Sequence, residues 1–156
     1  MHEFKEFGIR VYGLLLNEKD ELLLSHESIG NFSFTKLPGG GLKFGEDPVN
    51  CLKREIKEEL HLETEIQELL HVSDHVIPNR FIQGQQVITI YYLIKLDQKA
   101  TSFVNLNPEI HESLNTENII RREWKPIKEL KKSDFTFPAE KRLLEVLRIK
   151  WKEKFN

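Results

Sequence analysis

Short apolar runs bounded by polar clusters recur along the chain, and this pattern predicts β-strands. The runs cover residues 9–16, 21–24, 65–72, 86–95 and 119–124. The cluster Asn17-Glu18-Lys19-Asp20 separates the first two runs and is a turn signal, so we expect a β-hairpin over residues 9–24.

Residues 48–60 show the three- and four-residue spacing of an amphipathic helix. Their apolar stripe consists of Val49, Leu52, Ile56 and Leu60. Asp47 followed by Pro48 marks the start, because a carboxylate can cap free backbone N–H groups and proline suits the first helical position. We therefore expect a helix from Pro48 to about Leu60.

The C-terminal third combines an irregular stretch with a second helical pattern. Residues 97–118 are polar, contain Pro108 and show no clean period, so we expect a long loop. A final helix is expected from about Pro138. Its predicted apolar face consists of Leu143, Leu147 and Trp151.

Length and charge narrow the class of protein. A chain of 156 residues with 39% apolar residues suits one compact domain, residues 1–156. With 23 basic and 25 acidic side chains, it has no global positive field for binding nucleic acid or an anionic membrane. The apolar runs are too short to cross a bilayer. We therefore expect a soluble protein whose partner is a small molecule held locally.

The cysteine and two of the histidines show no pattern typical of a nucleophile or a metal site. The single Cys51 cannot form an internal disulfide, and the first residues lack a secretory signal pattern, so a cytoplasmic location is expected. We expect Cys51 to pack as a small hydrophobe rather than act as a nucleophile. His71 and His75 fall in an expected strand region, where their spacing does not form a helical metal-binding face. Structural or substrate-edge roles are expected for both.

Aromatic residues also recur in the expected strands: Phe32, Phe34, Tyr91 and Tyr92. They alternate between the two faces, so half of them should belong to the core. One that points outward is a candidate for stacking on a nucleobase.

Three carboxylates share one side of the expected helix. At about 100° per residue, Glu55, Glu58 and Glu59 fall in one sector, roughly 110° from the apolar stripe. An acidic helix face is usually only a solvated surface, but like charges at these spacings repel and favour a compensating cation. Hard oxygen ligands suit Mg²⁺ or Mn²⁺, which also accept waters and substrate phosphates.

A glycine loop precedes this helix. Gly39, Gly40 and Gly41 allow close backbone approach, so the loop can supply a carbonyl ligand or face a phosphate. Magnesium and a diphosphate would then meet at one place. The metal would neutralise the leaving group and lower the pKa of a bound water, as hydrolysis of a diphosphate requires.

The stretch from Gly40 to Leu62, GGLKFGEDPVNCLKREIKEELHL, resembles the Nudix box. The matching positions are Gly40, Glu46, Arg54, Glu55, Ile56, Glu58, Glu59 and Leu62. The preceding Leu37-Pro38-Gly39 is also typical of that family. One position departs, because His61 replaces a glycine just past the helix, where a left-handed conformation is common.

The resemblance implies an α/β fold, with a Nudix-like mixed β-sheet sandwiched between α-helices, and a metal-dependent hydrolase that cleaves a diphosphate linkage. It implies that Glu58 and Glu59 bind metal, and that Glu55 is a further ligand or the base. The glycine loop would bind as well, with the Gly39 carbonyl as a metal ligand. Arg54 would orient the carboxylates, with Glu46 in support. In many members the base lies outside the box, which leaves Glu109, Glu112 and Glu117 as alternatives.

The resemblance leaves the substrate open among ADP-ribose, nucleotide sugars, nucleoside triphosphates and dinucleoside polyphosphates. Pro78, sixteen residues past Leu62, is similar to a proline often found in ADP-ribose-cleaving members. The rival hypothesis is a non-catalytic nucleotide-sensing module, but such proteins commonly lose box carboxylates that this chain keeps. Homodimers are common in the family, and no feature of the sequence decides this.

Overall fold

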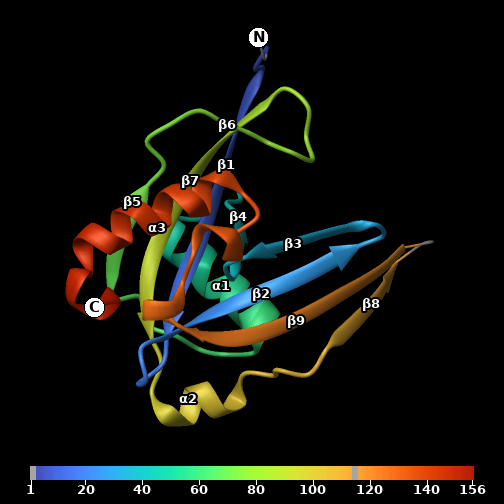
Figure 1. Cartoon of the computed structure of the whole chain (residues 1–156). Helices are drawn as coiled ribbons and strands as arrows, with labels where there is room; N and C mark the ends of the chain where they lie inside the picture. The colour runs from blue at the N-terminus through green and yellow to red at the C-terminus, as the bar shows by residue number, and fades with distance from the viewer. Residues whose placement is uncertain (1–2, 114–115) are drawn as a thin grey trace.

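The computed structural model describes residues 3–113 and 116–156 and shows a mixed β-sheet between helices (Figure 1). The strands are β1 (Glu6–Leu16), β2 (Glu21–Ile29), β3 (Phe32–Lys36), β4 (Gly39–Gly41), β5 (Glu68–Val72), β6 (Ile77–Pro78), β7 (Gln85–Lys95), β8 (Glu109–Ser113) and β9 (Thr116–Pro126). The helices are α1 (Pro48–Leu60), α2 (Gln98–Phe103) and α3 (Pro138–Lys150), with short 3-10 segments at Ile127–Glu129, Lys132–Asp134 and Lys152–Phe155. The predicted α/β architecture is confirmed.

Divergence of the first two strands creates the place where the site forms. β1 and β2 pair only at Leu16↔Leu22; β1 then runs parallel to β7, and β2 runs antiparallel to β3 and β9. The predicted turn is confirmed, and the Asn17 side chain accepts backbone hydrogen bonds that close it. The predicted hairpin ladder is wrong beyond that one pair. Since β3 pairs with β2 and β4 pairs with β1, the chain between them bridges the two halves of the sheet.

Alternate positions along β1 supply two separate cores. One cluster includes Leu14 and lies against Leu143 and Leu147 of α3. The other includes Leu15 and lies against Leu52 and Ile56 of α1. Burying a leucine side chain stabilises the fold by about 1.5–3 kcal/mol, so both helices are fixed on opposite faces of one sheet.

Both predicted helices form, with small changes in their apolar faces. On α1, Cys51 is fully buried, whereas Val49 is only half-buried. The cysteine therefore contributes more to the apolar face of the helix than the valine does. α3 begins at Pro138 as predicted, and it ends at Lys150. Trp151 therefore lies just past the helix, half-buried against the core.

The prediction of a loop over residues 97–118 is correct for residues 104–108 and wrong for the rest of the described part. Asp97 caps α2 by accepting the Ala100 backbone N–H at 2.7 Å, and β8 and the start of β9 occupy residues 109–113 and 116–118. Residues 114–115 lie outside the described part. β8 pairs only with β9, at the end of the sheet, so it lacks the apolar alternation of a half-buried strand. β5 begins at Glu68 instead of residue 65, and β2 continues to Ile29.

No helix within residues 3–113 and 116–156 is long and apolar enough to span a membrane.

Candidate active site

The glycine loop is held against both β1 and α1. A Cβ on Gly39, whose φ is +144°, would lie 2.1 Å from the Val11 carbonyl oxygen. A Cβ on Gly40 would lie 2.4 Å from the Glu55 carboxylate. The Val11 oxygen belongs to the backbone and the φ of Gly39 is positive, so Gly39 is required for this close approach to β1. At Gly40 a side chain would displace the Glu55 carboxylate from the loop.

Local signals fix the position of α1 as the sequence predicted. The Asp47 side chain accepts the Asn50 backbone N–H at 2.8 Å, and Pro48 occupies the first turn. The helix ends at His61, whose φ of 57° and ψ of 31° are left-handed, as expected for the residue that replaces the family glycine. These caps fix which residues of α1 face the glycine loop.

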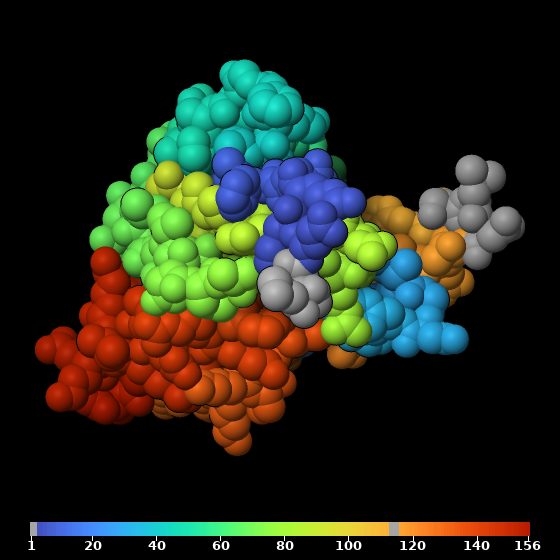
Figure 2. All heavy atoms as spheres, turned by 90° about the horizontal axis from the view of Figure 1, so that it is seen from above, coloured from blue at the N-terminus to red at the C-terminus, as the bar shows by residue number. Residues whose placement is uncertain are grey.

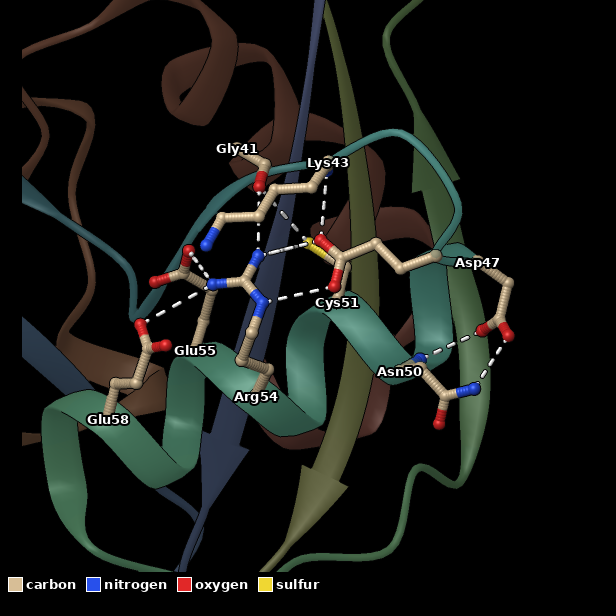
Figure 3. Close-up of polar contacts among 9 residues, drawn as sticks. Gly41, Lys43, Asp47, Asn50, Cys51, Arg54, Glu55 and Glu58 are labelled. Carbon is tan, nitrogen blue, oxygen red and sulfur yellow. Dashed lines mark hydrogen bonds and ion pairs between the residues drawn. The ribbon is translucent and has the colours of Figure 1, made fainter.

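Arg54 lies among the acidic side chains of the site (Figure 3). Its Nη2 and Nε donate to the two carboxylate oxygens of Glu46 at 2.7 and 3.0 Å, which is a bidentate pair. Its Nη1 donates to Glu55 at 2.9 Å and lies 3.4 Å from Glu58. The hydrogen bonds from Arg54 lower the pKa of Glu46 to about 2. This is the arrangement that an orienting arginine requires.

Glu59 lies in a second ionic group with Lys36 and Glu27. The Lys36 Nζ is 3.8 Å from Glu59 and 3.4 Å from Glu27. Burial raises the pKa of Glu59 to about 7, although Lys36 opposes that rise. Burial alone would lower the pKa of Lys36, but Glu59 and Glu27 outweigh it and raise that pKa. Sequence reasoning missed Lys36 and Glu27.

Arg10 is a second cation that sequence reasoning missed. Its Nε donates to the Tyr12 hydroxyl at 2.7 Å. Burial works to lower its pKa, but Tyr12 and then Glu55 and Glu59 raise it. The available signal was a charged residue inside an apolar strand, at Arg10, and one just before Leu37-Pro38-Gly39, at Lys36.

The three α1 carboxylates have the donor chemistry of a hard divalent cation, because all of their ligand atoms are oxygens. Within residues 3–113 and 116–156, however, no three acidic, histidine or cysteine side chains converge on one point. Glu55 and Glu58 turn toward Arg54, and Glu59 turns toward Lys36. The side chains of Glu58 and Glu59 are 57% and 23% exposed. The residues fit a divalent ion provided that these two side chains rotate away from their cations.

The three candidate bases outside the box differ in position. Glu109 accepts from Arg122 at 2.8 Å, and Arg122 also donates to the Glu59 backbone carbonyl. Glu109 and Glu59 both line a cavity of about 290 Å³ at the end of α1. Glu112 and Glu117 instead face each other across the β8–β9 pair, which extends away from α1 (Figure 1). The structure thus brings one of the three candidates to α1.

The cysteine, histidine and aromatic candidates differ in their burial. Cys51 is buried and its Sγ donates to the Gly41 carbonyl; burial raises its pKa to about 11, which agrees with a packed residue. His71 lies in β5, and His75 follows it and contacts Asp74 at 3.2 Å. Phe34 and Tyr91 are core residues, whereas Phe32 and Tyr92 are half-buried.

Glu140 is a further buried carboxyl, on the first turn of α3. It is 3% exposed, and its Oε2 has no hydrogen-bond partner among the described residues. Burial raises its pKa to about 7, although Arg10 and Lys36 oppose the shift. Because its pKa in the unfolded chain is lower, the folded protein binds the extra proton between these two values, and stability falls as pH rises through that window.

We expect Glu140→Gln to gain stability over wild type as pH rises. Between pH 5 and pH 8 the difference in free energy of unfolding should grow by about 2–3 kcal/mol in favour of the variant. Denaturant unfolding at the two pH values measures it. The exposed Glu153→Gln serves as control. Parallel pH curves for Glu140→Gln and wild type would show that this carboxyl does not titrate with a raised pKa.

Comparisons with known proteins agree with this geometry. The family model described as NUDIX domain matches residues 6–147. The solution structure of the E. coli ORF135 protein is 18% identical, with a TM-score of 0.65 over 92% of this chain and 90% of that one. The MutT protein from Methanosarcina mazei Go1 is 21% identical, with a TM-score of 0.64 over 95% and 97% of the two chains. A structure described as UDP-X diphosphatase is 19% identical, with a TM-score of 0.57 over 93% of this chain and 61% of that one.

At these identities the solved structures support the fold, and the family match carries the assignment. Nudix hydrolases are generally pyrophosphohydrolases that use divalent metal ions and act on small nucleoside diphosphate derivatives. Since the match covers most of the chain, this protein belongs to the NUDIX family and is a Nudix-type pyrophosphohydrolase.

Proposed function

We propose that this chain is a single Nudix domain that hydrolyses the diphosphate linkage of a nucleoside-diphosphate-linked substrate with Mg²⁺ or Mn²⁺ as cofactor. The observation that carries the proposal is the acidic face of α1 against the glycine loop, where Glu55 contacts Gly40 and Glu59 is largely withdrawn from water. A divalent cation there would offset the charge of the diphosphate and lower the pKa of a bound water.

Each side chain of this site would have a separate role. Glu58 and Glu59 would hold the metal, with Glu55 as a further ligand or as the base that takes a proton from water. The Gly39 carbonyl would be a further ligand, and Gly40 and Gly41 would let the loop approach the phosphates. Arg54, paired with Glu46, would keep the carboxylates in place. Glu109 stays an alternative base because it shares a cavity with Glu59.

Arg10 and Lys36 would bind the phosphates of the substrate. Both cations interact electrostatically with Glu59 from the sheet side. Arg10 makes no ion pair with a carboxylate among the described residues, and its Nε donates to the Tyr12 hydroxyl. Lys36 lies 3.4 Å from Glu27 and 3.8 Å from Glu59, so its ammonium group would exchange part of this ion pairing for a substrate phosphate. This pair therefore provides the local positive charge that an almost neutral chain lacks overall.

The candidate substrates share the anhydride and differ in the group attached to the diphosphate. ADP-ribose, nucleotide sugars and nucleoside triphosphates all contain the required anhydride, and the likeness to a structure described as UDP-X diphosphatase adds support for nucleotide sugars. Pro78, at the end of β6, is the feature in favour of ADP-ribose.

The test is a panel of ADP-ribose, nucleotide sugars and nucleoside triphosphates, and we expect at least one of them to be hydrolysed with Mg²⁺ or Mn²⁺. Chelation of the metal should abolish turnover, because without a cation the clustered carboxylates repel a polyanionic substrate. The products should be phosphomonoesters or pyrophosphate, identified by ³¹P NMR. Hydrolysis that continues in excess chelator would contradict the metal requirement. A panel without any turnover would contradict the proposed substrate class.

A further inference from the structure

Four phenylalanine rings from three distant parts of the chain form a cluster close to the proposed phosphate site. Phe32 and Phe34 lie on β3, Phe81 lies in the loop between β6 and β7, and Phe137 directly precedes α3. The ring centroids are 5.4 Å apart for Phe32–Phe34, 6.0 Å for Phe34–Phe81 and 5.7 Å for Phe34–Phe137. Figure 2 shows the loop (yellow-green) against the β2–β3 segment (light blue).

Phe81 is the exposed member of this cluster. It contacts all three other rings, yet 63% of its surface is open to solvent. The Phe81 ring therefore packs against the other three rings on one side and is open to solvent on the other. Phe7, Phe44 and Phe103 are also exposed, but none of them contacts another aromatic ring among the described residues.

Arg80 adds a cation to the same surface. Its Cζ lies 4.3 Å from the centroid of the Phe32 ring, within the range of a cation–π contact. Its guanidinium makes no hydrogen bond or ion pair with any residue that the structure describes. The N–H donors of Arg80 remain available to a polar ligand that also stacks.

The cluster is continuous with the proposed phosphate site. Phe34 and Lys36 lie two residues apart on the same side of β3, about 7 Å along the strand. Lys36 lies 3.8 Å from Glu59. A second link runs through residues 136–140, since Thr136 accepts the Thr35 backbone N–H at 2.8 Å and Glu140 interacts with Lys36.

We propose that the Phe32–Phe34–Phe81–Phe137 cluster binds the nucleobase of the substrate, which stacks on the open side of Phe81 while Arg80 donates hydrogen bonds to its polar edge. This inference rests on the proposed function, because it places the base on the same side of β3 as Lys36, which with Arg10 would bind the phosphates. An exposed ring next to a cationic site matches a ligand with a flat apolar part joined to an anionic part. It also assigns a role to an aromatic residue that sequence reasoning did not single out.

The experiment compares Phe81→Ala with Phe7→Ala, which removes a ring of similar exposure, 68%, from β1 and outside the aromatic cluster. Inhibition constants are measured in the presence of Mg²⁺ for the 5′-monophosphates of adenosine, guanosine, uridine and cytidine, and for inorganic pyrophosphate, which has no base. The substrate is whichever panel compound wild type hydrolyses. Thermal unfolding of each variant accompanies the assay.

We expect Phe81→Ala to weaken the tightest nucleoside monophosphate by a factor on the order of ten to a hundred, with pyrophosphate inhibition unchanged. Phe81→Trp should restore binding, and Phe81→Leu should not, because stacking needs a flat ring. Phe7→Ala should behave as wild type.

Unchanged nucleotide inhibition in Phe81→Ala, or equal weakening of nucleotide and pyrophosphate, would overturn the inference and leave the proposed function in place. Absence of hydrolysis by wild type would instead be a failure of the proposed function itself.

Discussion

Glu59→Gln is expected to lower turnover by a factor on the order of a hundred or more while thermal stability stays equal or rises. A hundredfold loss corresponds to about 2.7 kcal/mol of transition-state stabilisation. The charge of Glu59 is held largely out of water beside Glu55 and Glu27, so removing it relieves repulsion in the folded protein. The same charge is needed to hold the metal. Glu58→Gln should behave similarly, with a smaller change in stability because Glu58 is more exposed.

Steady-state kinetics and thermal unfolding of these variants measure the two effects separately. Glu65→Gln is the matched control, since Glu65 is an exposed carboxylate just past the same helix and, among the described residues, pairs only with Lys53. A Glu59→Gln protein that unfolded at a lower temperature and kept its specific activity would assign Glu59 to structure instead of catalysis.

Arg54→Lys is expected to depress turnover by about tenfold or more even though the charge is kept. The planar guanidinium of Arg54 binds both oxygens of Glu46 and still reaches Glu55, and a single ammonium group cannot reproduce that fork. Substrate affinity should change less, because Arg54 holds carboxylates and not phosphate. Single-turnover kinetics and direct titration of the variant separate these two quantities.

Arg142→Lys is the control for this change. Arg142 also contacts two carboxylates, those of Asp74 and Glu145, but on the exposed surface of α3. Intact chemistry with lost affinity in Arg54→Lys would mean that Arg54 binds the substrate phosphate, against the orienting role.

The features predicted correctly from the sequence depend on local signals. The Asp47 cap, Pro48 and the spacing of Leu52 and Ile56 specify α1 within a few residues, and the caps also fix where the Nudix-box carboxylates lie. The left-handed His61 follows from the same local geometry. These features need no knowledge of the rest of the fold.

The features that the sequence did not reveal depend on long-range pairing. Arg10 and Lys36 reach Glu59 only because β1 separates from β2 and leaves space for β3 and β4. Glu140 is buried only because α3 packs over that region. Phe81 joins Phe34 through the β6–β7 loop, whose position no local pattern specifies. Pairing between distant strands cannot be derived from periodicity within each strand.

The central claim is that the acidic face of α1 binds a divalent cation, and direct titration with Mn²⁺ tests it, with free Mn²⁺ followed by electron paramagnetic resonance. We expect wild type to bind Mn²⁺, more tightly when a nucleoside diphosphate is present, and Glu59→Gln to bind it at least about tenfold more weakly. Glu65→Gln should bind as wild type does. Absence of binding by wild type with or without the nucleotide, or equal affinity in wild type and Glu59→Gln, would contradict the proposed metal site.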